Sequence, residues 1–344
     1  MNRLTRRVLL QSALATGLAG CAGRVGTNAG TITAQPSASD GGELIIGLTY
    51  VPDIQFAPFY VAQAQGLFEQ AGLQVTLRHH GAQESLLGAV EAGDEHVVFA
   101  GGGEMLQAVG QGVAIRNFAT IYQRYPAAII VPAGSAINSV ADLRGRTVGL
   151  PGEYGENWFY LLAALEEAGL AVTDLNIQSI GFTQHAALTG AKVDAVVGFT
   201  NSDLVRFQTN DFLVRTLGPA DPPLVSLGLG GLAGVVAERA RELADLVQVV
   251  AAGAQFCLHD PAQSVELAKQ FVPTLAEPDQ VTNALATLQA TTALYGDRFG
   301  YQDADRWAAM TGFFAAHRLT PRQVAAADVF TADIVGGKQS VSPR

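Results

Sequence analysis

The chain has 344 residues, of which 49% are hydrophobic, and its formal net charge is −10. The negative charge and the absence of a later Lys/Arg cluster exclude nucleic acid as a partner, because neutralising phosphates requires a basic face. After the first forty residues, roughly 300 remain, which is enough for two domains of ordinary size.

The first twenty residues have the form of a secretory signal. Three arginines precede an apolar run at 8–19, which is too short to cross a bilayer. The run ends in Leu-Ala-Gly before Cys21 and resembles a bacterial lipobox, in which the cysteine receives a lipid. We therefore predict a signal peptide at 1–20 and a lipid anchor at Cys21, on the extracytoplasmic face of the cell membrane. The alternative is an ordinary buried first helix, and the Arg6-Arg7 pair leaves Sec and twin-arginine export both open.

The next segment, 21–42, is rich in Gly, Ala, Ser and Thr and is predicted to be a flexible tether. The second cysteine, Cys257, lies in an apolar helical stretch and has no disulfide partner once Cys21 is lipidated. It is predicted to be a small core residue and not a reactive thiol. No later apolar run has the length of a membrane span.

Strand and helix patterns then alternate along the chain. The apolar run at 44–50 predicts a buried strand, 58–71 a helix and 74–77 a second strand. A helix at 85–92 and a buried strand at 97–100 complete a βαβαβ series. Such a series predicts a mostly parallel sheet with helices on both faces.

The series recurs after 97 residues. Residues 69–75 (EQAGLQV) match residues 166–172 (EEAGLAV) at this offset. At the same offset fall two further glycine pairs, Gly93 with Gly190 and Gly101 with Gly198. The repeat predicts two similar lobes with a cleft between them, and ligands of such sheets bind outside the carboxyl ends of the strands.

Several segments carry a family resemblance. Residues 47–62 resemble the opening of the ABC-importer binding proteins for thiamine-pyrimidine precursors, riboflavin and alkyl sulfonates. Residues 139–149 resemble the start of that family's second lobe, and 193–198 resemble its Asp-Ala-apolar strand. The resemblance covers about 43–260, and within it 152–158 (GEYGENW) is most similar to the riboflavin-binding branch.

The resemblance implies an α/β fold, the two-lobe clamshell of type II periplasmic binding proteins, with a mostly parallel sheet flanked by helices in each lobe. The first lobe is expected at 43–131, the second at 132–230, and the return to the first lobe with the C-terminal helices at 231–344. Helices around 240–259 and 280–295 are expected to pack on the first lobe. The chain is expected to be a monomer without a cofactor or metal, passing riboflavin or a close flavin to the permease and ATPase subunits of an importer.

Three alternatives stay open. The ligand could be a thiamine pyrimidine precursor or another small aromatic heterocycle, and the cleft could belong to a ligand-sensing domain. The third alternative is an enzyme of this fold acting on a pyrimidine. Against an enzyme, the chain has no His-x-x-x-His or Cys-x-x-Cys metal spacing, no Gly-x-Ser-x-Gly elbow and no Cys-rich motif like that of the family's pyrimidine-forming enzyme.

The loops at the strand ends supply candidate ligand residues. An isoalloxazine ring needs aromatic faces, and its imide edge and ribityl hydroxyls need amide or carboxylate groups. The predicted ligand-binding residues are Tyr50, Asp53, Gln55, Phe56, Gly102, Glu104, Tyr122, Tyr154, Asn157, Trp158, Asn201 and Asp203. Core packing is the alternative for Tyr50 and Trp158, and helix capping is the alternative for Asn157, Asn201 and Asp203.

Overall fold

A computed structural model describes residues 42–49, 51–80 and 85–335. The predicted signal peptide, Cys21, nearly all of the predicted tether and Tyr50 lie outside these residues. No helix in the described ranges is long and apolar enough to cross a membrane.

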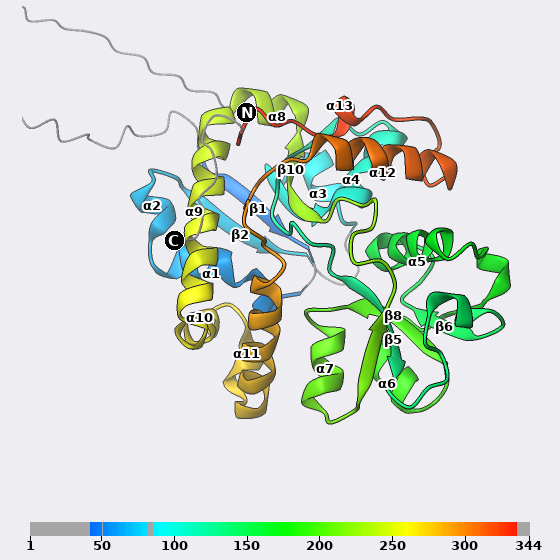
Figure 1. Cartoon of the computed structure of the whole chain (residues 1–344). Helices are drawn as coiled ribbons and strands as arrows, with labels where there is room; N and C mark the ends of the chain where they lie inside the picture. The colour runs from blue at the N-terminus through cyan, green and yellow to red at the C-terminus, as the bar shows by residue number, and fades with distance from the viewer. Residues whose placement is uncertain (1–41, 50, 81–84, 336–344) are drawn as a thin grey trace, which may run out of the picture. The chain divides into compact units, whose positions relative to one another are not determined.

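The first sheet has the strand order β2-β1-β3-β10-β4. Figure 1 labels β1, β2 and β10 of this sheet. Its strands are β1 (Leu44–Leu48), β2 (Val75–His79), β3 (Val97–Gly101), β4 (Ile115–Thr120) and β10 (Leu227–Leu232). Strand β1 is parallel to β2 and β3, whereas β10 is antiparallel to both β3 and β4. Four of the five strands therefore run in one direction, and β10 alone opposes them.

The second sheet repeats this arrangement with the order β7-β6-β8-β5-β9. Its strands are β5 (Ala127–Pro132), β6 (Thr147–Leu150), β7 (Asn176–Ser179), β8 (Ala195–Phe199) and β9 (Val214–Leu217). Here β6 is parallel to β7 and β8, and β5 is the antiparallel strand. The predicted α/β fold with two mostly parallel sheets is confirmed, with one reversed strand in each sheet.

The chain changes sheet earlier than the sequence indicated. It passes from the first sheet to the second between Thr120 and Ala127, and returns between Leu217 and Leu227. The predicted lobe limits, after residues 131 and 230, instead assign β5 to the first lobe and most of β10 to the second. The difference arises because each crossing strand joins its new sheet at once, and an apolar strand carries no local mark of the sheet that it joins.

Helices cover both faces of the first sheet. One face packs against α1 (Ala57–Ala64), α8 (Ala233–Glu238), α9 (Ala240–His259), α10 (Pro261–Ala268) and α11 (Pro278–Thr292). The short helix α2 (Leu67–Gln70) follows α1. The other face packs against α3 (Gly88–Ala92), α4 (Gly102–Gln111), α12 (Ala304–Ala316) and α13 (Ala326–Val329).

The second sheet has α5 (Gly155–Glu167) on one face and α6 (Gln184–Thr189) and α7 (Asp203–Thr209) on the other. Single 3-10 turns are η1 (Ile54–Phe56), η2 (Val140–Leu143), η3 (Val172–Asp174) and η4 (Pro273–Ala276). The α5 face belongs to a hydrophobic cluster that also contains α4 and α12 of the first lobe. Gly103 of α4 lets this junction form, because a Cβ there would lie 2.8 Å from the ring of Phe159 and 2.9 Å from that of Phe314.

Cys257 lies in α9 and is 1% exposed, in the core of the first lobe. Burial raises the pKa of its thiol to about 12, so the thiolate is disfavoured at neutral pH. The prediction of a core position for this cysteine is confirmed.

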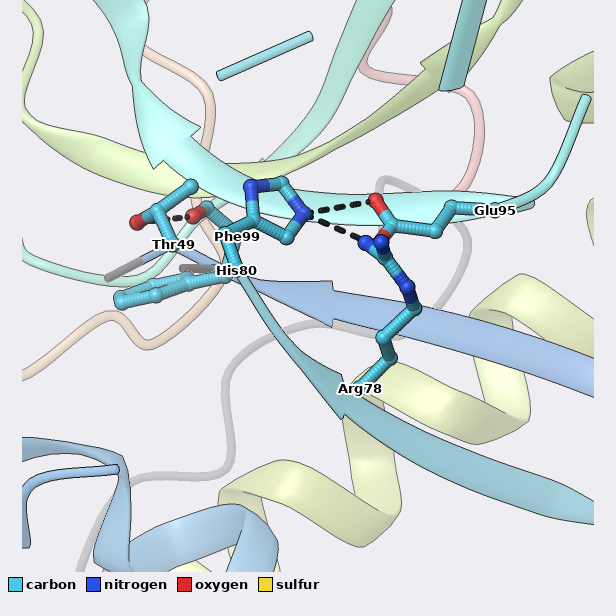
Figure 2. A network of polar contacts seen from close by, with 5 residues as sticks. All are labelled: Thr49, Arg78, His80, Glu95 and Phe99. Carbon is cyan, nitrogen blue, oxygen red and sulfur yellow. Dashed lines mark hydrogen bonds and ion pairs between the residues drawn. The ribbon is translucent and has the colours of Figure 1, made fainter. Parts of the chain in front are cut away.

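A buried carboxylate ties the strands of the first sheet together (Figure 2). Glu95, just before β3, accepts from Arg78 Nη1 at 2.5 Å, and His80 Nε2 lies 2.8 and 2.9 Å from its two oxygens. The carboxylate occupies the space above Gly47 of the intervening strand β1, where any Cβ would overlap it. Beside this network Thr49 Oγ1 donates to the Phe99 carbonyl oxygen at 2.8 Å, which holds the ends of β1 and β3 together.

Candidate functional site

A cavity of about 430 Å³ lies at the carboxyl ends of the parallel strands of both sheets. Its volume is within the range that encloses a drug-sized ligand. From the first lobe it is lined by the end of β1, the turn η1, the start of α4, η4 and α11. From the second lobe it is lined by the starts of α5, α6 and α7 and by the end of β8. This is the place that the topology of open α/β sheets assigns to a ligand.

The first-lobe wall is formed by the residues that follow β1. Asp53 begins η1, and its side chain accepts from the backbone N–H of Gln55 at 3.0 Å. Burial raises the pKa of this carboxyl. Phe56 packs edge-on against Phe99, with ring centroids 6.0 Å apart. This wall of the cavity therefore combines apolar aromatic rings with the carboxyl group of Asp53.

Two aromatic rings of the second lobe stand beside the cavity. Tyr154 is 59% exposed and Phe182 is 64% exposed, and both line the cavity. Gly155 follows Tyr154 with a φ of +69°, which turns the chain into α5 and leaves the tyrosine ring outside the core. These rings offer faces for stacking on a flat ligand.

Two carboxylates, one from each lobe, lie close together in the cavity lining, half-buried Glu104 and buried Glu156. Glu104, in the first turn of α4, accepts from the backbone N–H of Gly101 at 3.1 Å. Glu156, in the first turn of α5, is 5% exposed, and neither of its oxygens has a hydrogen-bond partner among the described residues. A Cβ on Gly101 would overlap Oε1 of Glu156 and lie 2.9 Å from Oε2 of Glu104, so both carboxylates reach the same glycine.

Burial dominates the acidity of this pair. It raises the pKa of Glu104 to about 7. It also raises the pKa of Glu156 well above its usual range, and the nearby charge of Glu104 adds to that increase. Two close carboxylates titrate as a unit, so the pair retains at least part of a proton near neutral pH.

A fourth carboxylate and a single guanidinium lie on the second-lobe wall. Asp203 accepts from the backbone N–H of Phe199 at 2.8 Å, and burial raises its pKa to about 6 against the opposing influence of Arg206. Arg206 is the only Lys or Arg among the described residues that line the cavity. Its charge lies one helical turn from Asp203.

The structure brings seven of the predicted ligand residues together around the cavity. They are Asp53, Gln55, Phe56, Glu104, Tyr154, Asn157 and Asp203. Asn157 is 5% exposed, and its Oδ1 has no hydrogen-bond partner in the described structure. An unpartnered buried acceptor of this kind is stabilised by a donor from a ligand or water.

Four other predicted residues do not line this cavity. Tyr122 packs in the first-lobe core against Phe99 and Tyr295, and Trp158 is 8% exposed within the core shared by the lobes. Asn201 is buried and donates to Thr291 Oγ1 at 3.0 Å. Gly102 packs against Val225, and its neighbour Gly101 lines the cavity in its place. Three of these four residues, Gly102, Trp158 and Asn201, are directly next to a lining residue, and a loop sequence does not reveal which of two neighbours faces a cavity.

The sequence-based reasoning missed two groups of lining residues. Glu156, Phe182, Gln184 and Arg206 stand at the helix starts of the second lobe. Glu156 lies inside the 152–158 motif and could have been found by asking which carboxylate α5 turns toward α4. The second group comes from η4 and α11: Thr274, Leu275, Gln280, Asn283, Ala284 and Thr287. No strand-end rule identifies these residues, because they belong to the C-terminal helices.

In the described ranges, no group of three or more His, Cys, Asp or Glu side chains is arranged to hold a metal ion. The cavity instead combines aromatic rings, aliphatic side chains, amides and carboxylates. Such a lining suits an organic ligand with a flat apolar body and several hydrogen-bonding groups.

Comparison with known proteins identifies a matching family and similar binding proteins. Residues 53–264 match the family described as NMT1/THI5 like. A riboflavin-binding protein of Chloroflexus aurantiacus is 31% identical over 317 residues, which cover 88% of this chain and 88% of that protein. A formylaminopyrimidine-binding protein of Halalkalibacterium halodurans is 24% identical, over 83% of this chain and 88% of that protein.

Among solved structures, the periplasmic aliphatic sulphonate binding protein of Escherichia coli superposes with a TM-score of 0.69. The superposition covers 84% of this chain and 97% of that chain, at 18% sequence identity. Similarity at this identity establishes the shared fold of two α/β lobes.

Proposed function

The chain belongs to the NMT1/THI5-like family, and we propose that it is the solute-binding protein of an ABC importer that carries riboflavin or a close flavin. The observation that carries the proposal is the 31% identity to a riboflavin-binding protein across 88% of both chains. A binding protein of this kind encloses its ligand between the lobes and delivers it to the permease and ATPase subunits. It is a receptor and not an enzyme.

The cavity supports a flavin as ligand. The exposed rings of Tyr154 and Phe182 offer faces to an isoalloxazine, and a stacked aromatic pair contributes roughly 0.5–1.5 kcal/mol beyond the buried area. Amides at Gln55, Asn157 and Gln184 line the same cavity and can pair with the imide edge and the hydroxyls.

Fluorescence titration tests the proposal directly. Adding the purified protein to riboflavin at micromolar concentration is expected to quench the flavin emission, because stacking against tyrosine brings an electron-rich ring to the isoalloxazine. Protein purified from a host that makes riboflavin is expected to be yellow. Unchanged emission at saturating protein would contradict the proposal.

A pyrimidine precursor is the second candidate ligand, favoured by the 24% identity to the formylaminopyrimidine-binding protein. A thermal-shift panel separates the candidates, because a ligand that binds only the folded state raises the melting temperature. Riboflavin is expected to give the larger shift. A larger shift with formylaminopyrimidine would reassign the ligand within the same class of function.

The remaining alternatives need other observations. An enzyme of this fold would convert a pyrimidine. Because we propose a receptor, incubation with pyrimidine substrates is expected to leave them unchanged. A sensing domain would bind the same ligand, so binding alone does not separate it from a transport protein. Neighbouring genes for a permease and an ATPase favour transport, whereas a neighbouring gene for a sensor kinase favours sensing.

We place the protein outside the cytoplasm, anchored to the membrane by a lipid on Cys21. The support is the lipobox-like sequence before Cys21, which lies outside the described residues. An anchor followed by a tether keeps a loaded receptor close to its permease, which raises its effective concentration there.

A further inference from the structure

We propose that Glu104 and Glu156 form the subsite for the hydroxyl groups of the ligand and make the cavity select an uncharged polyol chain over a phosphorylated one. This inference rests on the proposed function, because it assigns an orientation and a specificity to the same cavity. In flavin terms, the ribityl chain points to the carboxylate pair, and riboflavin is bound in preference to its 5′-phosphate.

The first observation is an unused pair of acceptors. Both side-chain oxygens of Glu156 are buried in the cavity wall without a well-formed hydrogen bond among the described residues, because the nearby Tyr125 hydroxyl donates to the Glu156 backbone carbonyl oxygen at 3.1 Å. An ionised carboxylate only accepts hydrogen bonds and a protonated one also donates, so in either state a hydroxyl group, which both donates and accepts, is a suitable complement. Leaving such acceptors buried and unpaired is unfavourable, and hydroxyl donors from a ligand would relieve that cost.

The second observation is the meeting of the two lobes at this point. Glu104 stands on α4 and Glu156 on α5, and the two side chains converge on Gly101. A chain of adjacent hydroxyls can donate to both carboxylates at once, so it joins the lobes through the ligand.

The third observation is the distribution of charge. Four carboxylates line the cavity, on Asp53, Glu104, Glu156 and Asp203, against one guanidinium in the described lining. That guanidinium, on Arg206, stands one turn from Asp203 and favours its ionised form. A phosphate placed beside the pair would therefore have at most this one guanidinium to offset its charge, and burying an unpaired charge is costly.

The fourth observation fixes which end of the ligand lies inward. The exposed aromatic rings, on Tyr154 and Phe182, contrast with Glu156, which is 5% exposed. A flat ring that stacks on the exposed side leaves its substituent to enter the buried part. The ring would thus occupy the aromatic side and the ribityl chain the acidic side.

The test is a set of fluorescence titrations with three flavins. Riboflavin has the polyol chain, its 5′-phosphate adds charge at the end of that chain, and lumiflavin has the ring without the chain. Each is titrated with the wild type, with Glu156→Gln and with Glu104→Gln. Glu153→Gln is the matched control, because Glu153 is exposed and lies three residues before Glu156.

The wild type is expected to bind riboflavin at least tenfold more tightly than either other flavin. Glu156→Gln is expected to weaken riboflavin at least tenfold, since one carboxyl oxygen that can accept a hydrogen bond is replaced by an NH2 group that cannot, and to leave lumiflavin within twofold. The preference for riboflavin over its phosphate is expected to shrink at least threefold in both Gln variants at the pair, and to stay unchanged in Glu153→Gln.

Unchanged lumiflavin binding also shows that a variant is folded, so loss of riboflavin affinity alone reports the subsite. Equal weakening of riboflavin and lumiflavin would overturn the inference, as would equal wild-type affinity for riboflavin and its phosphate. Those results leave riboflavin binding itself intact. A wild type that binds none of the three flavins would overturn the proposed function and, with it, this inference.

Discussion

Gly101 shows how closely the site depends on single residues. Its φ of −67° is ordinary for any residue, so the need for glycine is steric and not conformational. The space that a side chain would fill is held by the carboxylates of Glu104 and Glu156. The glycine therefore allows two acidic side chains from different lobes to share one position.

Replacing Gly101 by alanine is expected to displace Glu156 and to weaken riboflavin binding at least tenfold. Forcing a methyl group into a filled site also costs about 1–3 kcal/mol of stability. Titration and urea unfolding measure the two effects. Gly134→Ala is the control, because nothing lies within 4 Å of a Cβ at Gly134, and equal behaviour of the two variants would contradict the steric argument.

The pair also predicts a pH dependence of stability. The pKa of Glu104 rises from 4.5 to about 7 on folding, so the folded state binds more protons than the unfolded state between these values. The free energy of unfolding then falls as the pH rises through this window, by up to about 1.4 kcal/mol per pH unit.

Glu104→Gln is expected to remove this contribution and to stabilise the protein at pH 8 relative to the wild type. The measurement is urea unfolding of both proteins at pH 5 and pH 8. At each pH the free energy of unfolding of the wild type is subtracted from that of the variant, and the two differences are compared. The same difference at both pH values would show that Glu104 does not titrate in this window.

At the scale of elements, α11 joins two parts of the fold. It packs against α9 and α10 of the first lobe, and it also contacts α7 of the second. Two hydrogen bonds reach across: Asn201 Nδ2 donates to Thr291 Oγ1 at 3.0 Å, and Thr209 Oγ1 donates to Asn283 Oδ1 at 3.1 Å. The first is buried and the second exposed, so they differ in their expected effect on stability.

Thr291→Val is expected to lower the free energy of unfolding by about 1–3 kcal/mol, because it leaves the buried amide of Asn201 without its acceptor. Thr209→Val removes the exposed bond, where water replaces the partner, and is expected to change stability by less than about 0.5 kcal/mol. Chemical unfolding measures both. A larger loss of stability from Thr209→Val than from Thr291→Val would contradict the claim that the buried bond stabilises the protein more than the exposed one.

At the scale of the whole molecule, binding and anchoring are expected to be independent. The residues that line the cavity fall between Thr49 and Thr287, far along the chain from Cys21. Binding stabilises the folded state, by about 2.7 kcal/mol when the free ligand is a hundred times its dissociation constant.

Cys21→Ser is expected to move the protein from the membrane fraction to the soluble fraction, since the lipid needs a thiol. Its affinity for riboflavin is expected to stay within twofold of the wild type. Cell fractionation and titration test the two parts, with Cys257→Ser as the control that retains the anchor. A membrane-bound Cys21→Ser protein would exclude lipidation at this residue.

The sequence predicts the position of strands better than the direction in which individual side chains point. Strand β1 was recognisable because it is an apolar run ended by polar residues, and its polar follower Asp53 was expected at the cavity for the same reason. Trp158 follows Asn157 directly, yet one faces the core and the other the cavity. Adjacent residues in a helix point about 100° apart, and a motif read as a string does not say which of them faces the ligand.

By itself, the sequence determined the α/β class, the repeat of two lobes, the family and the strand ends at which the cavity lies. These features follow from local patterns of hydrophobicity and from glycines at turns, which are written in short stretches of chain. Only the tertiary structure decided that β5 and β10 change sheets, that α11 closes one side of the cavity and that Glu104 meets Glu156. Such contacts join residues far apart in sequence, and their energies depend on burial and proximity that exist only in the folded chain.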